Sequence, residues 1–132
     1  MNGNETLHQS NLPRSPAQDA YDKICEELRQ IIREIRARPS DSIVRRKDIK
    51  GRCGRAIPTT YLDIAKGVFP PPFAIGARAV GFSANELDAW IAARSYASRS
   101  IVPVDMKAFV TLLVQSRKKQ LRPTQQAMPT AD

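Results

Sequence analysis

Three consecutive prolines, at positions 70–72, interrupt a chain whose apolar residues otherwise recur at helical spacing. Proline lacks a backbone N–H and its ring clashes with the preceding helical turn, so residues 69–73 cannot be helical. After the prolines, residues 73–75 and 79–82 flank a tight turn at Gly76-Ala77-Arg78. This pattern predicts a short β-hairpin, which is marginally stable unless it packs on helices.

Helical patterns lie on both sides of the predicted hairpin. Residues 43–66 predict two short helices separated by a turn near Cys53-Gly54-Arg55. After the hairpin, Ser83-Ala84-Asn85-Glu86 has the capping-box pattern of a helix N-terminus. We interpret residues 43–96 as a winged helix-turn-helix domain, so the predicted fold class is mainly α with a small β-hairpin wing. The apolar face of its last helix is formed by Leu87, Trp90 and Ile91.

One amphipathic helix is predicted before this domain, in residues 16–39. We expect it to run without interruption from Pro16, which suits a first helical turn, to Arg38, and to end at Pro39. Its apolar stripe packs on the chain's own core or forms a seam with a second copy, and the sequence leaves both open. The stripe consists of Tyr21, Ile24, Leu28, Ile31 and Ile35.

A second amphipathic helix is predicted after the domain, within residues 103–121. Lys and Arg gather near its C-terminal end, where they complement the helix dipole. Residues 1–15 and 122–132 are polar and contain prolines, so we expect both to be disordered tails. The apolar face of this second helix is formed by Met106, Phe109, Val110 and Leu113.

The chain is strongly basic, because its 132 residues include 21 Lys and Arg against 13 Asp and Glu, a net charge of +8. Such a charge is typical of polyanion binding, although many soluble proteins carry it without an acidic partner. Six cations fall on the predicted first helix and turn of the helix-turn-helix motif, where they neutralise DNA phosphates or only face solvent. These six are Arg45, Arg46, Lys47, Lys50, Arg52 and Arg55.

Further candidate DNA contacts lie on the second helix and on the hairpin. The N-terminal part of the second helix of such a motif enters the major groove, so Thr59 and Thr60 are predicted to contact bases or phosphates. Tyr61, beside them, is predicted to pack in the core. Lys66 ends this helix, and Arg78 at the hairpin tip is placed to lie along the backbone or enter a narrow minor groove.

The sequence contains no recognisable active site. The only histidine, His8, lies in the predicted N-terminal tail, and Cys25 and Cys53 lack the further cysteines of a zinc site. We therefore predict a protein that is not an enzyme and that needs no cofactor and no metal. No segment approaches the ~20 apolar residues of a membrane span, which predicts no membrane partner and a cytoplasmic, nucleoid-associated protein.

Four short motifs follow one another at fixed spacing in residues 57–91. They are Thr59-Thr60-Tyr61, Gly67-Val68-Phe69-Pro70, Gly76-Ala77-Arg78 and Glu86-Leu87-Asp88-Ala89-Trp90-Ile91. Together they resemble the AlpA-like regulators of prophages and mobile elements. Those proteins carry a Thr-x-Tyr recognition helix, a Gly-x-Phe-Pro step, a Gly-x-Arg wing and a Glu-x-x-x-Trp-Ile helix. Phe82 departs from the family, in which this aromatic is commonly Trp.

The resemblance implies a winged helix-turn-helix related to the MerR and excisionase groups, with Thr59 and Thr60 facing the groove and Arg78 as the wing contact. In such a fold Gly67 ends the recognition helix where a positive φ is needed. Phe69 and Trp90 then fill the small core. The flanking helices lie outside the resemblance.

The predicted function is sequence-specific binding of double-stranded DNA by a protein of a mobile element. It acts as an excisionase, which biases a recombinase toward excision, as a transcriptional regulator, or as both. The predicted partners are DNA, further copies of the chain in a dimer or a DNA-assisted array, and an integrase or recombinase. An alternative of another class is an adaptor, whose two amphipathic helices bind a protein partner while the winged domain serves as scaffold. The basic cluster weighs against the adaptor.

Overall fold

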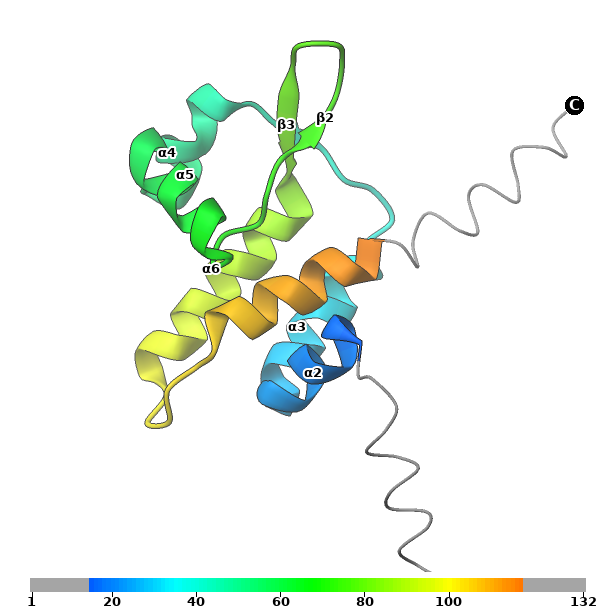
Figure 1. Cartoon of the computed structure of the whole chain (residues 1–132), viewed down its shortest axis with the longest axis vertical. Helices are drawn as coiled ribbons and strands as arrows, with labels where there is room; N and C mark the ends of the chain where they lie inside the picture. Colours follow the sequence, from blue (N-terminus) through cyan, green and yellow to red (C-terminus); the bar gives the residue numbers. More distant parts are fainter. Residues whose placement is uncertain (1–14, 118–132) are drawn as a thin grey trace, which may run out of the picture.

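The computed structural model describes residues 15–117, so the two predicted tails, apart from Ser15, lie outside the described residues. Helices predominate, with one small sheet, which confirms the predicted fold class of a winged helix-turn-helix with flanking helices (Figure 1). In chain order the elements are α2 (Pro16–Lys23), α3 (Glu26–Arg36), β1 (Ile43–Val44), η1 (Arg46–Asp48), α4 (Ile49–Cys53), α5 (Ile57–Lys66), β2 (Phe73–Ala74), β3 (Val80–Ser83) and α6 (Ala84–Arg99), followed by a last helix that is described over residues 106–117.

The wing is a three-stranded antiparallel sheet of order β1-β3-β2. β2 and β3 form the predicted hairpin, with Phe73 opposite Gly81. β1, which the sequence predicts as the start of a helix, instead pairs with the other edge of β3 and places Val44 opposite Phe82. This pairing satisfies backbone groups that an open strand edge would leave exposed. A Cβ at position 81 would lie 2.5 Å from Cγ2 of Ile43, so the close approach of β1 requires glycine there.

The helix-turn-helix motif is formed by α4 and α5. The short 3-10 helix η1 leads into α4, and α4 ends at Gly54, within the predicted turn. α5 ends at Gly67, whose φ of 79° is a left-handed conformation that residues with a Cβ rarely adopt. The predicted end of the recognition helix is therefore confirmed.

Phe69 and Trp90 lie in the core of the winged domain, as predicted. Their ring centroids are 4.9 Å apart, and Phe82 meets the ring of Phe69 edge-on. The indole Nε1–H of Trp90 donates a hydrogen bond to the carbonyl of Val68 at 3.0 Å, which satisfies the polar end of the buried ring. This contact holds the segment after α5 against α6 and so positions the wing relative to the recognition helix.

The prediction of one continuous helix over residues 16–38 is wrong. Ile24 has an extended backbone and separates α2 from α3. Tyr21 from the predicted stripe is exposed and Ile31 is only partly buried. The buried positions of α2, α3 and the break between them are Ala20, Ile24, Leu28, Ile32 and Ile35. α3 packs against α6 of the same chain (Figure 1), so the stripe packs on the chain's own core.

The C-terminal helix contributes its predicted apolar face to the same core. Met106, Phe109, Val110 and Leu113 are all buried, as the spacing predicts. Residues 106–117 lie alongside both α3 and α6 in Figure 1, and the guanidinium of Arg36 donates to the carbonyl of Leu113 at 2.8 Å. The two flanking segments thus belong to one core with the winged domain.

A buried carboxylate, that of Glu86, ties three helices together. Its side chain is 2% exposed. Its carboxylate oxygens form ion pairs with the guanidinium nitrogens of Arg36 on α3, at 2.7 Å, and of Arg117 on the C-terminal helix, at 2.5 Å. The capping box predicted at the start of α6 is accordingly half formed. Ser83 Oγ accepts from the Glu86 N–H at 3.1 Å, but the Glu86 carboxylate turns inward to the arginines.

Candidate nucleic-acid interface

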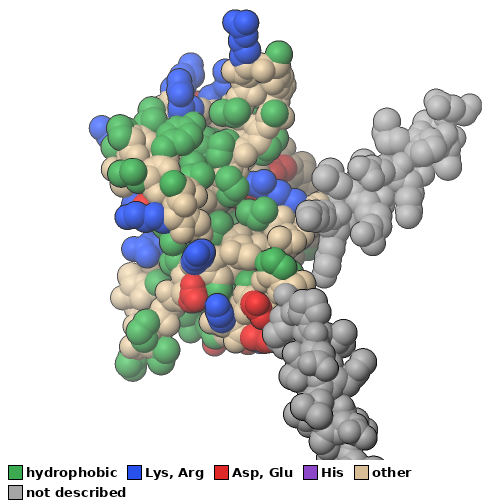
Figure 2. Space-filling view, in the orientation of Figure 1, with side chains coloured by type: hydrophobic (Ala, Val, Ile, Leu, Met, Phe, Trp, Pro, Cys, Tyr) green, Lys and Arg blue, Asp and Glu red, His purple; other side chains and the backbone are tan. Residues whose placement is uncertain are grey.

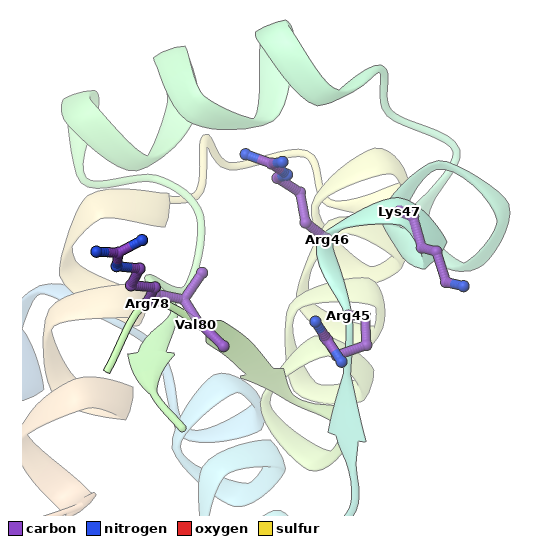
Figure 3. A pocket seen from close by; sticks show the side chains of 6 residues that line it. Arg45, Arg46, Lys47, Arg78 and Val80 are labelled. Carbon is purple, nitrogen blue, oxygen red and sulfur yellow. The ribbon is translucent and has the colours of Figure 1, made fainter. Parts of the chain in front are cut away.

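Four predicted DNA-contacting cations line one open hollow between the wing and the start of the helix-turn-helix motif. The hollow has a volume of about 380 Å³ and is completed by Ala79 and Val80 (Figure 3). In Figure 3 the side chain of Arg46 extends into the space between α5 and the wing, whereas that of Lys47 points the opposite way. Three of these cations come from the segment that joins β1 to α4, and the fourth comes from the wing: Arg45, Arg46, Lys47 and Arg78.

Ion pairs divide the predicted DNA-contacting cations into two groups. Arg52 pairs with Asp88 at 2.9 Å, and Arg55 pairs with Asp63. A cation that is already neutralised within the protein releases fewer counterions when it meets a phosphate. We therefore expect the cations without an ion pair to dominate the electrostatic part of DNA binding, and they form the second group. Within residues 15–117, the cations of this second group take part in no ion pair; they are Arg45, Arg46, Lys47, Lys50, Lys66 and Arg78.

Arg55 links the turn of the helix-turn-helix motif to the core. Its guanidinium carbon lies 5.8 Å from the ring centroid of Trp90, and its partner Asp63 is buried on α5. The Nε atom of Arg55 is buried and has no hydrogen-bond partner in the described part of the chain. This packing gives Arg55 a structural role that the sequence did not indicate.

Asp88 fastens α4 to α6. Its carboxylate accepts hydrogen bonds from Arg38 at 2.8 Å and from Arg52 at 2.9 Å. Burial by itself raises the pKa of Asp88, but the hydrogen bonds from Arg38 and Arg52 outweigh it and hold the pKa below its ordinary value.

Because Asp88 is paired with two arginines, we expect its contribution to the free energy of unfolding to depend on pH. Because the pKa is lower in the folded chain than in the unfolded one, this stabilisation is present above the unfolded pKa of about 3.9 and is lost as the pH falls through the folded pKa. Urea unfolding of the wild type and of Asp88→Asn tests this. The difference between their free energies of unfolding should shrink below about pH 4, and a difference independent of pH would contradict the prediction.

The recognition helix α5 requires two corrections to the predicted positions. Thr60, predicted to face the groove, is 1% exposed, and its hydroxyl donates to the carbonyl of Ala56 at 3.0 Å. Tyr61, predicted to be a core residue, is 36% exposed. Thr59 is exposed, as a DNA contact requires. The reason is the rotation of α5, which turns Thr60 and Asp63 toward the core and leaves Thr59 outside.

Sequence reasoning also missed Leu62, which is 63% exposed on the outer side of α5. Its exposure follows from the rotation of α5: because the helix advances about 100° per residue, burial of Thr60 and Asp63 leaves Leu62 on the side away from the core.

Substitution of each threonine in turn distinguishes the structural role of Thr60 from the DNA-contacting role predicted for Thr59. Thr60→Ala removes a buried hydrogen bond and should lower the free energy of unfolding by about 1–2 kcal/mol. Thr59→Ala should change it by less than about 0.5 kcal/mol, because the side chain is exposed. It should weaken specific DNA binding by about 1 kcal/mol. Urea unfolding and fluorescence anisotropy measure the two effects, and the reverse assignment of effects would contradict the prediction.

The described residues 15–117 contain no group of His, Cys, Asp and Glu side chains that is arranged to hold a metal ion. None of the helices in this part of the chain is long and apolar enough to cross a membrane. Burial raises the pKa of the Cys53 thiol despite the neighbouring Arg52, so the thiol is a poor nucleophile.

Comparison with known proteins supports the resemblance drawn from the motifs. The family model described as Prophage CP4-57 regulatory protein (AlpA) matches residues 42–95. The match includes the helix-turn-helix motif, the wing and most of α6, and it leaves out α2, α3 and the C-terminal helix. Searches of curated proteins and of solved structures found no significant match. Residues 42–95 of this chain are therefore similar to the AlpA family of prophage regulatory proteins.

Proposed function

We propose that the protein binds specific sequences in double-stranded DNA and regulates a mobile element, as an excisionase, as a transcriptional regulator, or as both. One observation carries the proposal: four cations from two separate segments line one hollow, and none of them is ion-paired within residues 15–117. Like charges that lie around one hollow without partners repel one another, although Lys47 points away from Arg46 (Figure 3), and a phosphate backbone relieves this repulsion. The AlpA-family match supports the same conclusion independently.

In the proposed complex α5 enters the major groove and the wing lies beside it. Thr59 then lies near base edges, because it belongs to the first turn of α5. Arg78 extends from the wing toward the backbone or an adjacent minor groove. Phosphates on the side of the hollow are held by Arg45, Arg46, Lys47 and Lys50, and Lys66 serves the C-terminal end of α5.

Association of several copies on DNA, and contact with an integrase, belong to the same proposal. The apolar stripes of α3 and of the C-terminal helix are buried in the chain's own core, so such contacts have to use other surfaces. The same burial weighs against the adaptor alternative, in which these stripes bind a protein partner. The basic hollow has no role in that alternative.

The direct test is selection of bound fragments from the genome of the host, followed by mobility-shift assays over a range of salt concentrations. We expect affinity to fall steeply with salt, with a logarithmic slope of about −0.9 for each phosphate neutralised. Absence of DNA affinity at low salt would overturn the proposal. Arg99→Ala is a matched control, because Arg99 lies at the end of α6 that is remote from the wing (Figure 1).

The two forms of regulation are separated by the position of the fragments and by a recombination assay. Fragments at an integration boundary, together with stimulation of excision by purified integrase, support the excisionase role. Promoter fragments with no effect on recombination support transcriptional regulation alone.

A further inference from the structure

The outer face of the recognition helix is apolar, although it belongs to the most basic part of the molecule. Leu62 has the largest exposed fraction of the large hydrophobic residues in residues 42–95, at 63%. Pro58 and Ala65 are also exposed, and their spacing of four and three residues from Leu62 places all three on one side of α5. A single exposed leucine is ordinary. An exposed apolar stripe along the outer face of a recognition helix, in contrast, indicates a surface that binds a partner.

The surroundings of this apolar stripe identify its partner as DNA. Thr59 and Lys66 border the stripe on α5, and both are exposed. The hollow lined by Arg46 and Arg78 lies on the side of α5 that faces the wing (Figure 3). Figure 2 shows hydrophobic side chains over α5 with Lys and Arg side chains around them. A hydrophobic protein partner has no use for this border of unpaired cations, whereas DNA presents two rows of phosphates with base edges between them.

The major groove offers one apolar group to such a stripe, the C5-methyl of thymine. Leu62 has no hydrogen-bonding atom, so it gains nothing from the polar edges of guanine or cytosine and leaves them without a partner. On the basis of the proposed function, we propose that Leu62 contacts a thymine methyl group in the major groove and thereby selects an A·T pair at that position.

Deoxyuridine substitution tests this contact, because uracil keeps every hydrogen-bonding group of thymine and lacks only the methyl group. The selected DNA site is prepared with each thymine replaced in turn by deoxyuridine, and binding of the full chain is measured by anisotropy. At one or two positions the wild type should bind about fourfold more weakly, the effect of one buried methyl group. With Leu62→Ala, thymine and uracil should bind equally well at those positions.

Ile101→Ala is the matched control, because Ile101 is fully exposed on the loop after α6 and should leave the discrimination unchanged. Specific binding by the wild type without any deoxyuridine effect would overturn this inference and leave the proposed function intact. Persistent discrimination in Leu62→Ala would also overturn it. Sedimentation of the free chain reports its oligomeric state. If Leu62→Ala changes that state but not the DNA affinity, the stripe is an interface between copies of the chain and the inference is wrong. Absence of DNA binding by the wild type would overturn the proposed function as well.

Discussion

Glu86→Gln should lower the free energy of unfolding by roughly 3 kcal/mol, measured by urea denaturation. The substitution keeps the size of the side chain but leaves the guanidinium groups of Arg36 and Arg117 without their shared counter-charge. Their side chains are 17% and 26% exposed, so water restores only part of the lost interaction. Uncompensated charges in partly buried sites are costly, and we expect the flanking helices to loosen together with the winged domain.

Glu34→Gln is the control for this experiment, because Glu34 is an exposed carboxylate on α3 without an ion pair in the described residues. It should change the free energy of unfolding by less than about 0.5 kcal/mol. A loss below about 1 kcal/mol for Glu86→Gln would contradict the view that the carboxylate joins the three helices, because that value is typical of an exposed ion pair.

Combined substitution Arg46→Ala with Arg78→Ala should reduce DNA affinity on the order of 50-fold at about 0.1 M salt, if each side chain neutralises one phosphate. The logarithmic salt slope should become shallower by about 1.8 for the same reason. Both side chains line the hollow and are exposed, so the free energy of unfolding should remain nearly unchanged. Mobility-shift assays across a salt series measure both quantities.

Arg52→Ala provides the comparison that tests the division of the cations by ion pairing. Because Arg52 is paired with Asp88, its removal should affect the salt slope less than removal of Arg46 alone, and should affect stability more. Equal salt slopes for the wild type and the Arg46→Ala, Arg78→Ala double variant would show that the hollow does not meet DNA phosphates.

Residue patterns in the sequence were sufficient for the features that depend on local backbone chemistry. The three prolines and the turn at Gly76-Ala77-Arg78 predict the hairpin, and the glycine at position 67 predicts the end of the recognition helix. The helical spacing of Met106 and Phe109 predicts the buried face of the C-terminal helix. In each case the cause acts within a few residues, through a missing N–H, a positive φ or the periodicity of a helix.

Interactions between distant residues decided the rest. Ile43 and Val44 become a strand because β3 offers an unpaired edge. The helix predicted over residues 16–38 is interrupted at Ile24, and no local sequence pattern explains this break. Which of two adjacent threonines faces outward depends on how α5 is rotated against the core, and this rotation is set by packing. The pairing of Arg52 with Asp88 joins residues 36 positions apart.

The sequence alone determined the hairpin, the end of the recognition helix and the location of the basic segment, because these follow from residue type and short-range spacing. The tertiary structure alone decided which cations remain unpaired and which side of the recognition helix faces outward. The physical reason is that a side chain's charge and exposure depend on neighbours that the fold brings together, such as Asp88 beside Arg52 and Asp63 beside Arg55.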